Sequence, residues 1–152
     1  MELKDLLVLC IEKKASDLHL TENEPPILRV DGNLIRTNNA VLDKTELKKI
    51  IFSVMTNPQK EAFERDLELD FSLALPGMDR FRVNIHMQKS SVEAAFRRVP
   101  LKIPTIEELK LPPIITDLAR KPNGLVLITG PTGMGKTTTL AAMIDLINNE
   151  RE

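Results

Sequence analysis

The stretch Gly124–Asn149, GLVLITGPTGMGKTTTLAAMIDLINN, decides the fold of the C-terminal part of the chain. Its apolar run from Leu125 to Thr129 predicts a buried strand, and the following residues predict a helix over 136–148 with an apolar face. Four positions between and at these elements fit the pattern G-x-x-x-x-G-K-[ST], namely Gly130, Gly135, Lys136 and Thr137. A strand, a glycine-rich loop and a helix in this order predict a phosphate-binding loop.

The residue types of this loop suit a triphosphate. Glycines allow backbone N–H groups to face inward around a phosphate, and the helix N-terminus adds about half a positive charge. A lysine in the first helical turn opposes the helix dipole by about 0.3–1 kcal/mol unless an anion is bound there, so a plain surface turn explains Lys136 poorly. We expect Lys136 to reach the β- and γ-phosphates of ATP and the Thr137 hydroxyl to hold Mg²⁺, both as catalytic groups. The expected nucleotide-binding residues are Gly130, Pro131, Thr132, Gly133, Met134, Gly135, Lys136, Thr137 and Thr138.

Hydrolysis of ATP needs more than this loop. A P-loop ATPase also requires an acid at the end of a later strand and a group that orients the attacking water. The only acids after Thr137 are Asp145, Glu150 and Glu152, on the helix or just past it, and Asp70 is expected to be an ordinary exposed strand residue. We therefore expect these residues to be a fragment of an ATPase: the loop binds ATP and Mg²⁺ in the complete protein, and the fragment alone is inactive.

The composition excludes several classes of protein. The 152 residues are 42% hydrophobic and 28% charged with a net charge of -1, which is typical of a globular protein with room for one domain and part of another. A pI near 6.2 and 3% aromatic residues argue against nucleic acid as a partner. The single cysteine, Cys10, lies in an apolar run and is expected to be buried rather than to bind metal. No run approaches 18 apolar residues and no leader pattern is visible, so we expect a cytoplasmic protein without membrane insertion.

Residues 1–99 predict an α+β domain with an antiparallel sheet and helices on one face. We expect a helix over 3–14 with Lys13 and Lys14 in its last turn, a strand near 17–20, and a hairpin at Asp31-Gly32. Two further helices are expected, one capped by Asp43 and one capped by Asn57 with Pro58 at its first position, followed by three strands within 67–99. Prolines at 100, 104, 112 and 113 predict a linker over 100–113, and 114–152 is expected to begin a second domain.

The segment RFRVNIHMQ alternates apolar and polar residues. A period of two places Phe81, Val83, Ile85 and Met87 on one face of a strand and the polar residues, including Arg80 and Arg82, on the other. Arg97 and Arg98 should then point in opposite directions, with Arg98 structural. The plain interpretation of the polar face is solvation, because exposed charges there stabilise by no more than about 1 kcal/mol each. His19 and His86 lack the spacing of metal ligands and are expected to be structural.

Several segments together resemble a known family. ASDLHL, the Pro25-Pro26 pair before LRVDG, RFRVN, IPTIEEL and the loop stretch, in this order and spacing, are similar to the secretion-superfamily ATPases, and most closely to the PilT-like retraction motors of type IV pili. The resemblance implies a PAS-like domain at 1–99, a linker, and the start of a RecA-like P-loop core at 114–152. It also implies a homohexameric ring that hydrolyses ATP at the inner membrane, peripherally attached through the pilus platform machinery. The catalytic glutamate, Walker B segment and histidine box would lie beyond residue 152.

The same resemblance assigns a role to arginines. In that family, arginines of this strand and of the following FRR segment face the nucleotide of a neighbouring subunit, which makes Arg80, Arg82 and Arg97 candidate catalytic groups. A forked, always-charged guanidinium suits charge that develops on a transferred phosphoryl group. One departure from the family pattern is Met134, where a small residue is common.

Two other functions stay open. Pilus-extension and type II secretion ATPases share the pattern but carry a longer N-terminal region, and the start of SDLHL at residue 16 favours retraction. A non-catalytic PAS-like sensing or assembly module with a vestigial loop is the second alternative, against which the intact Lys136 and Thr137 argue. Because the strand at 125–129 lacks neighbours, we expect 1–100 to fold and 114–152 to remain loose if these residues are produced alone.

Overall fold

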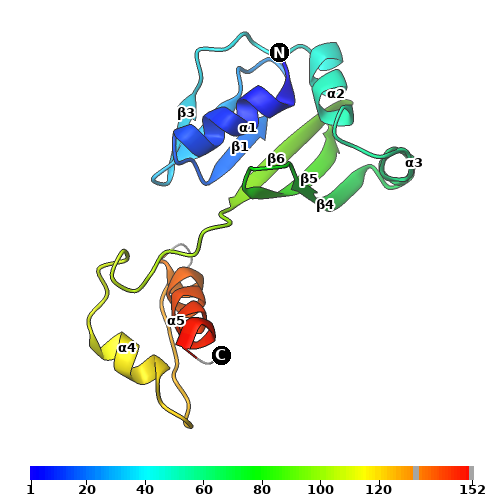
Figure 1. Ribbon diagram of the computed structural model, residues 1–152. Helices are drawn as coiled ribbons and strands as arrows, with labels where there is room; N and C mark the ends of the chain where they lie inside the picture. The colour runs from blue at the N-terminus through cyan, green and yellow to red at the C-terminus, as the bar shows by residue number, and fades with distance from the viewer. Residues whose placement is uncertain (132–133, 151–152) are drawn as a thin grey trace. The chain divides into compact units, whose positions relative to one another are not determined.

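A computed structural model describes residues 1–131 and 134–150 (Figure 1). The chain forms two compact units, Met1–Leu101 and Lys102–Glu152, with the boundary directly after Leu101. Each unit has a hydrophobic core of its own, so each is described by itself.

The first unit contains a six-stranded sheet in the order β3-β2-β1-β6-β5-β4, in which every neighbouring pair is antiparallel. This confirms the α+β domain with an antiparallel sheet. The three strands expected within 67–99 are also present. The bounds of the strands are β1 Asp17–Leu20, β2 Ile27–Val30, β3 Asn33–Arg36, β4 Glu68–Ala74, β5 Arg80–Gln88 and β6 Ser91–Val99.

The hairpin between β2 and β3 turns at Asp31-Gly32, as expected. Val30 and Asn33 are paired, and the two residues between them have φ values of 49° and 82°. Both central positions of this two-residue turn require positive φ, which explains the Asp-Gly sequence.

Three helices belong to this unit: α1 Leu3–Glu12, α2 Lys44–Phe52 and α3 Asn57–Asp66. Asp43 caps α2 as predicted, accepting hydrogen bonds from the Thr45 and Glu46 amides at 2.8 Å each. Two expected helix ends were wrong. Helix α1 stops at Glu12, because Lys13 is its C-cap and Lys14 has a φ of 52°.

The second wrong end is the start of α3. Its N-cap is Thr56 rather than Asn57, and Gln59 completes a capping box by accepting from the Thr56 amide at 2.8 Å. A threonine hydroxyl followed three residues later by glutamine satisfies two amides at the helix start. Pro58 is therefore the second helical position, where its missing N–H is still harmless.

The core of the first unit lies between the helices and one face of the sheet. Helices α1, α2 and α3 contact β1, β6 and β4 respectively. The apolar side of β5 supplies Phe81, Val83 and Ile85, all fully buried, whereas Met87 at the strand end is 37% exposed. The opposite face of the sheet carries the polar residues and receives no helix of this unit.

The second unit contains α4 Ile114–Ala119 and α5 Lys136–Glu150. Its small core consists of Ile106, Ala119, Ala142 and Met143. The strand expected at 125–129 is absent, and Leu125 and Leu127 are 81% and 75% exposed. The physical reason is that a strand needs a hydrogen-bonded neighbour, and no described segment of the chain supplies one here.

Candidate functional site

The glycine-rich loop lies at the N-terminus of α5. Gly130 has a φ of 152° and Gly135 a φ of 79°, and the helix begins at Lys136. A Cβ atom at either glycine would meet no other atom within 4 Å, so backbone conformation rather than space demands glycine here. Two glycines with positive φ therefore precede the N-terminus of α5.

Lys136 is turned back over this loop. Its Nζ donates a hydrogen bond to the Pro131 carbonyl at 2.7 Å, which places the ammonium beside the loop backbone rather than along the helix surface. Thr137 and Thr138 are exposed, as are Pro131 and Met134. Thr132 and Gly133, two of the expected binding residues, lie outside the described residues.

The loop fits a magnesium nucleotide only in part. Thr137 offers one exposed hydroxyl, and the described residues contain no group of three His, Cys, Asp or Glu side chains that could hold a metal ion. Mg²⁺ prefers six oxygen ligands and retains several waters beside substrate phosphates, so one protein hydroxyl is compatible with such a site.

A second candidate site occupies the polar face of the sheet in the first unit. The register pairs Arg97 of β6 with Asp17 of β1 on one side and with Arg82 of β5 on the other. Asp70 of β4 is paired with Asn84 of β5. An open cavity of about 290 Å³ lies on this face, lined by Asp17, His19, Asp70, Arg82, Asn84, Ala95 and Arg97.

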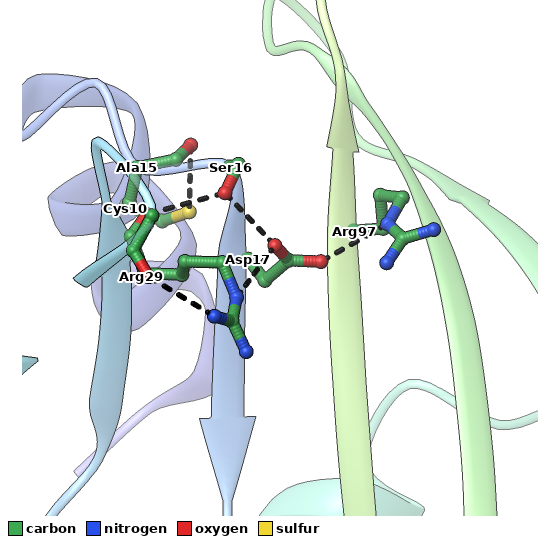
Figure 2. A network of polar contacts seen from close by, with 7 residues as sticks. Cys10, Ala15, Ser16, Asp17, Arg29 and Arg97 are labelled. Carbon is green, nitrogen blue, oxygen red and sulfur yellow. Dashed lines mark hydrogen bonds and ion pairs between the residues drawn. The ribbon is translucent and has the colours of Figure 1, made fainter. Parts of the chain in front are cut away.

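Asp17 is the centre of this face (Figure 2). It is only 6% exposed, and its Oδ2 accepts a hydrogen bond from the Ser16 hydroxyl at 2.8 Å. Its Oδ1 accepts from Arg97 Nε at 3.0 Å, and Arg29 Nε lies 3.4 Å from Oδ2. Burial by itself would raise the pKa of Asp17, but the hydrogen bonds from Ser16 and Arg97 and the charge of Arg97 hold it below its ordinary value. The carboxylate is therefore ionised at neutral pH.

The three candidate arginines differ in how they are held. Arg97 is hydrogen-bonded to Asp17, whereas Arg82 has a looser contact, with Nη2 3.6 Å from Asp70 Oδ2. Arg80 faces the same side but does not line the cavity. Arg98 points to the opposite face, as expected, and its Nε donates to Asp79 Oδ2 at 2.5 Å.

Sequence reasoning placed Asn84 on the polar side of its strand but missed Asp17 and His19 as members of this face. The Nε2 of His19 is buried without a hydrogen-bond partner among the described residues, and burial lowers the pKa of this imidazole. The alternation in DLHL and RVNIH carried part of the signal, since it places these side chains on one side of their strands. Only the strand register brings them together.

Comparison with known proteins defines the class of this chain. The family model described as "Type II/IV secretion system protein" matches residues 2–152, and the chain belongs to this family. No described helix has the length and apolar composition needed to cross a membrane.

Within the family the chain is PilT-like. It is 44% identical over 151 residues to the type IV pilus retraction ATPase PilT of Pseudomonas aeruginosa, covering 99% of this chain and 44% of that protein. It is 39% identical over 148 residues to the type IV pilus ATPase PilU of the same organism, covering 97% and 39%. A crystal structure of the pilus retraction motor PilT with bound ADP matches with a TM-score of 0.80 at 38% identity, covering 97% of this chain and 43% of that one. The chain spans less than half the length of these relatives.

Proposed function

We propose that this chain is the nucleotide-binding part of a motor ATPase that powers retraction of type IV pili. The proposal depends chiefly on one observation: Lys136 stands at the start of α5 with its ammonium over the glycine loop, in a chain similar throughout to PilT. The relative that was crystallised with ADP supports an adenine nucleotide as the ligand.

In this proposal the loop residues Gly130 to Thr138 hold the phosphates. Their backbone amides, the helix N-terminus and Lys136 attract the negative charge, and the Thr137 hydroxyl provides one Mg²⁺ ligand. Bound Mg²⁺ would neutralise charge on the phosphates. Residues 1–99 would form the PAS-like domain, 100–113 the linker and 114–152 the start of the RecA-like core, with ATP turnover moving one domain against the other.

The loop is tested by nucleotide titration of the full-length protein. We expect Lys136→Ala to weaken binding of a fluorescent ATP analogue by about tenfold or more, because a charged contact to phosphate is lost. Lys121→Ala is the matched control, an exposed lysine of the same unit that should leave affinity unchanged. Equal affinity of the Lys136→Ala variant and the wild type would refute the proposed ligand site.

We further propose that Arg80, Arg82 and Arg97 act on the nucleotide of a neighbouring subunit in a hexameric ring. The support is that all three are exposed, on the face of the sheet that receives no helix of the first unit. Each alanine variant in the full-length protein should lower the turnover number, by about a hundredfold or more for a group that stabilises the transferred phosphoryl. Arg36→Ala, at the sheet edge, is the control. Ring-dependent turnover that survives an alanine substitution would remove that arginine from the site.

Retraction is favoured over type II secretion because PilT is 44% identical to this chain, whereas the type II secretion system protein E of Pseudomonas aeruginosa is 28% identical over 91% of it. The preference for retraction over extension stays a prediction from the sequence, based on the start of SDLHL at residue 16. In cells that lack their own retraction ATPase, the full-length protein should restore twitching motility. Restored pilus assembly in cells lacking the extension ATPase would instead support that alternative. A non-catalytic module predicts no ATP turnover in the full-length protein.

A further inference from the structure

Asp17 is a buried carboxylate at the first position of β1, and burying such a charged group is energetically costly. Removing a charge from water is unfavourable unless hydrogen bonds and opposite charges compensate for it, and an apolar side chain often serves stability equally well. Here the compensation comes from Ser16 and from two arginines, Arg29 and Arg97, whose side chains are 38% and 71% exposed. Solvent screens such half-open pairs, so they contribute little to stability. Stability alone therefore does not account for Asp17.

The geometry of the contact with Arg97 shows what the carboxylate does instead. Asp17 accepts the Nε–H of Arg97 and not its terminal groups, as Figure 2 shows. The two terminal NH₂ groups of the guanidinium stay directed away from the carboxylate and make no hydrogen bond to the described residues. A side chain held at Nε is fixed in orientation while its forked end remains available for a phosphate.

The charges on this face support the same conclusion. One carboxylate is shared between Arg29 and Arg97, so this trio keeps a net positive charge and can still attract an anion. Arg29 is itself anchored a second time, because its Nη1 donates to the Gly32 carbonyl at 3.2 Å. Arg82 has only the long contact to Asp70. Arg97 is thus the most firmly oriented of the three candidate arginines.

We propose that Asp17 is the positioning residue of Arg97, holding its guanidinium so that the terminal NH₂ groups meet a phosphate anion presented to this face. The role of that anion rests on the proposed function, in which it belongs to the nucleotide of a neighbouring subunit. The orientation of Arg97 by Asp17 is independent of that function and can be measured by itself.

The first experiment measures ATP turnover in the full-length protein with Asp17→Asn, Arg97→Ala and the double variant. A misplaced catalytic group costs about a hundredfold, so Asp17→Asn should lower kcat by about tenfold to a hundredfold with KM nearly unchanged. The double variant should be no slower than Arg97→Ala, because Asp17 acts only through that arginine. Asp17→Glu, which keeps the charge but moves the carboxylate, should be intermediate and guards against a folding defect. Glu24→Gln is the matched control, since Glu24 accepts two hydrogen bonds from Arg36 away from this face.

The second experiment separates this proposal from the proposed function. The Nε–H signal of Arg97 in the ¹⁵N NMR spectrum of the chain should exchange slowly in the wild type and rapidly in Asp17→Asn, while the backbone spectrum stays folded. If Arg97→Ala leaves turnover intact but the Nε–H is protected, the orientation stands and the role in catalysis fails. An unprotected Nε–H in the wild type would overturn the positioning role, as would full kcat in Asp17→Asn beside a slow Arg97→Ala.

Discussion

Asp79 ties the turn between β4 and β5 to the point where the chain leaves the first unit. Its Oδ2 accepts from Arg98 Nε at 2.5 Å and its Oδ1 accepts from the Leu101 amide at 2.9 Å. The side chains of Asp79 and Arg98 are only 15% and 20% exposed, so water replaces these contacts poorly. We predict that Asp79→Ala destabilises this unit and loosens the segment around Leu101.

The expected loss follows from these contacts. A hydrogen bond between charged groups contributes about 1.5–3 kcal/mol, and the Leu101 amide, which can turn to water, adds about 1 kcal/mol or less. Taken together we expect a loss of about 2–3 kcal/mol, a large share of the 5–15 kcal/mol typical of a domain this size. With a urea m-value of about 1.5 kcal/mol/M, the midpoint should fall by about 1.3–2 M.

Urea denaturation followed by circular dichroism measures this midpoint. Removing both partners should cost less than removing one, since Asp79→Ala with Arg98→Met leaves no half-buried cation unpaired. Asp66→Ala is the control, because Asp66 pairs with Arg65 on the open surface and its removal should cause no measurable shift. A midpoint for Asp79→Ala within the error of the wild type, or a double variant less stable than the single one, would refute the reasoning.

Three other predictions concern the same unit. Phe63 is the only buried residue of α3, and its ring packs edge-on against Phe52 with ring centroids 5.9 Å apart. In urea denaturation, Phe63→Ala should lower the free energy of unfolding by about 3–5 kcal/mol, and Phe63→Leu should lower it much less. Cys10 is fully buried and burial raises the pKa of its thiol to about 11, so a thiol reagent at pH 8 should label the native chain far more slowly than the urea-unfolded chain; equal rates would contradict this. The pKa of Asp79 is held below its ordinary value, despite burial, by hydrogen bonds from the Leu101 amide and Arg98. Its contribution to stability is therefore complete above about pH 4 and is lost as the pH falls further, so Asp79→Asn should flatten the acid-side decline of the melting temperature.

Much of the fold could be predicted from local sequence. The Asp31-Gly32 turn and the alternation in β4, β5 and β6 are short-range signals that tertiary contacts did not override. The start of α3 failed because the Thr56 and Gln59 pair was overlooked in favour of Asn57. The segment 125–129 failed because an apolar run becomes a strand only where another strand can pair with it.

The two candidate sites differ in how much of each could be predicted from the sequence. The loop before Lys136 is contiguous, so its pattern could be recognised without a structure. The polar face depends on the pairing of β1 with β6, which joins Asp17 to Arg97 across 80 residues. The alternation within a single strand does not show which residue of another strand lies opposite. Asp17 was therefore interpreted as an ordinary strand residue.

The place of β6 in the sheet has a mechanical consequence. It is bonded on both sides, to β1 and to β5, and the chain leaves the unit just beyond its end. A pulling force applied at Leu101 along β6 would act in shear on the hydrogen bonds to both β1 and β5 at the same time. An edge strand, by contrast, is held by one row of hydrogen bonds only. The first unit would therefore transmit tension with little deformation. Extension under load would occur first in the proline-rich segment after Leu101.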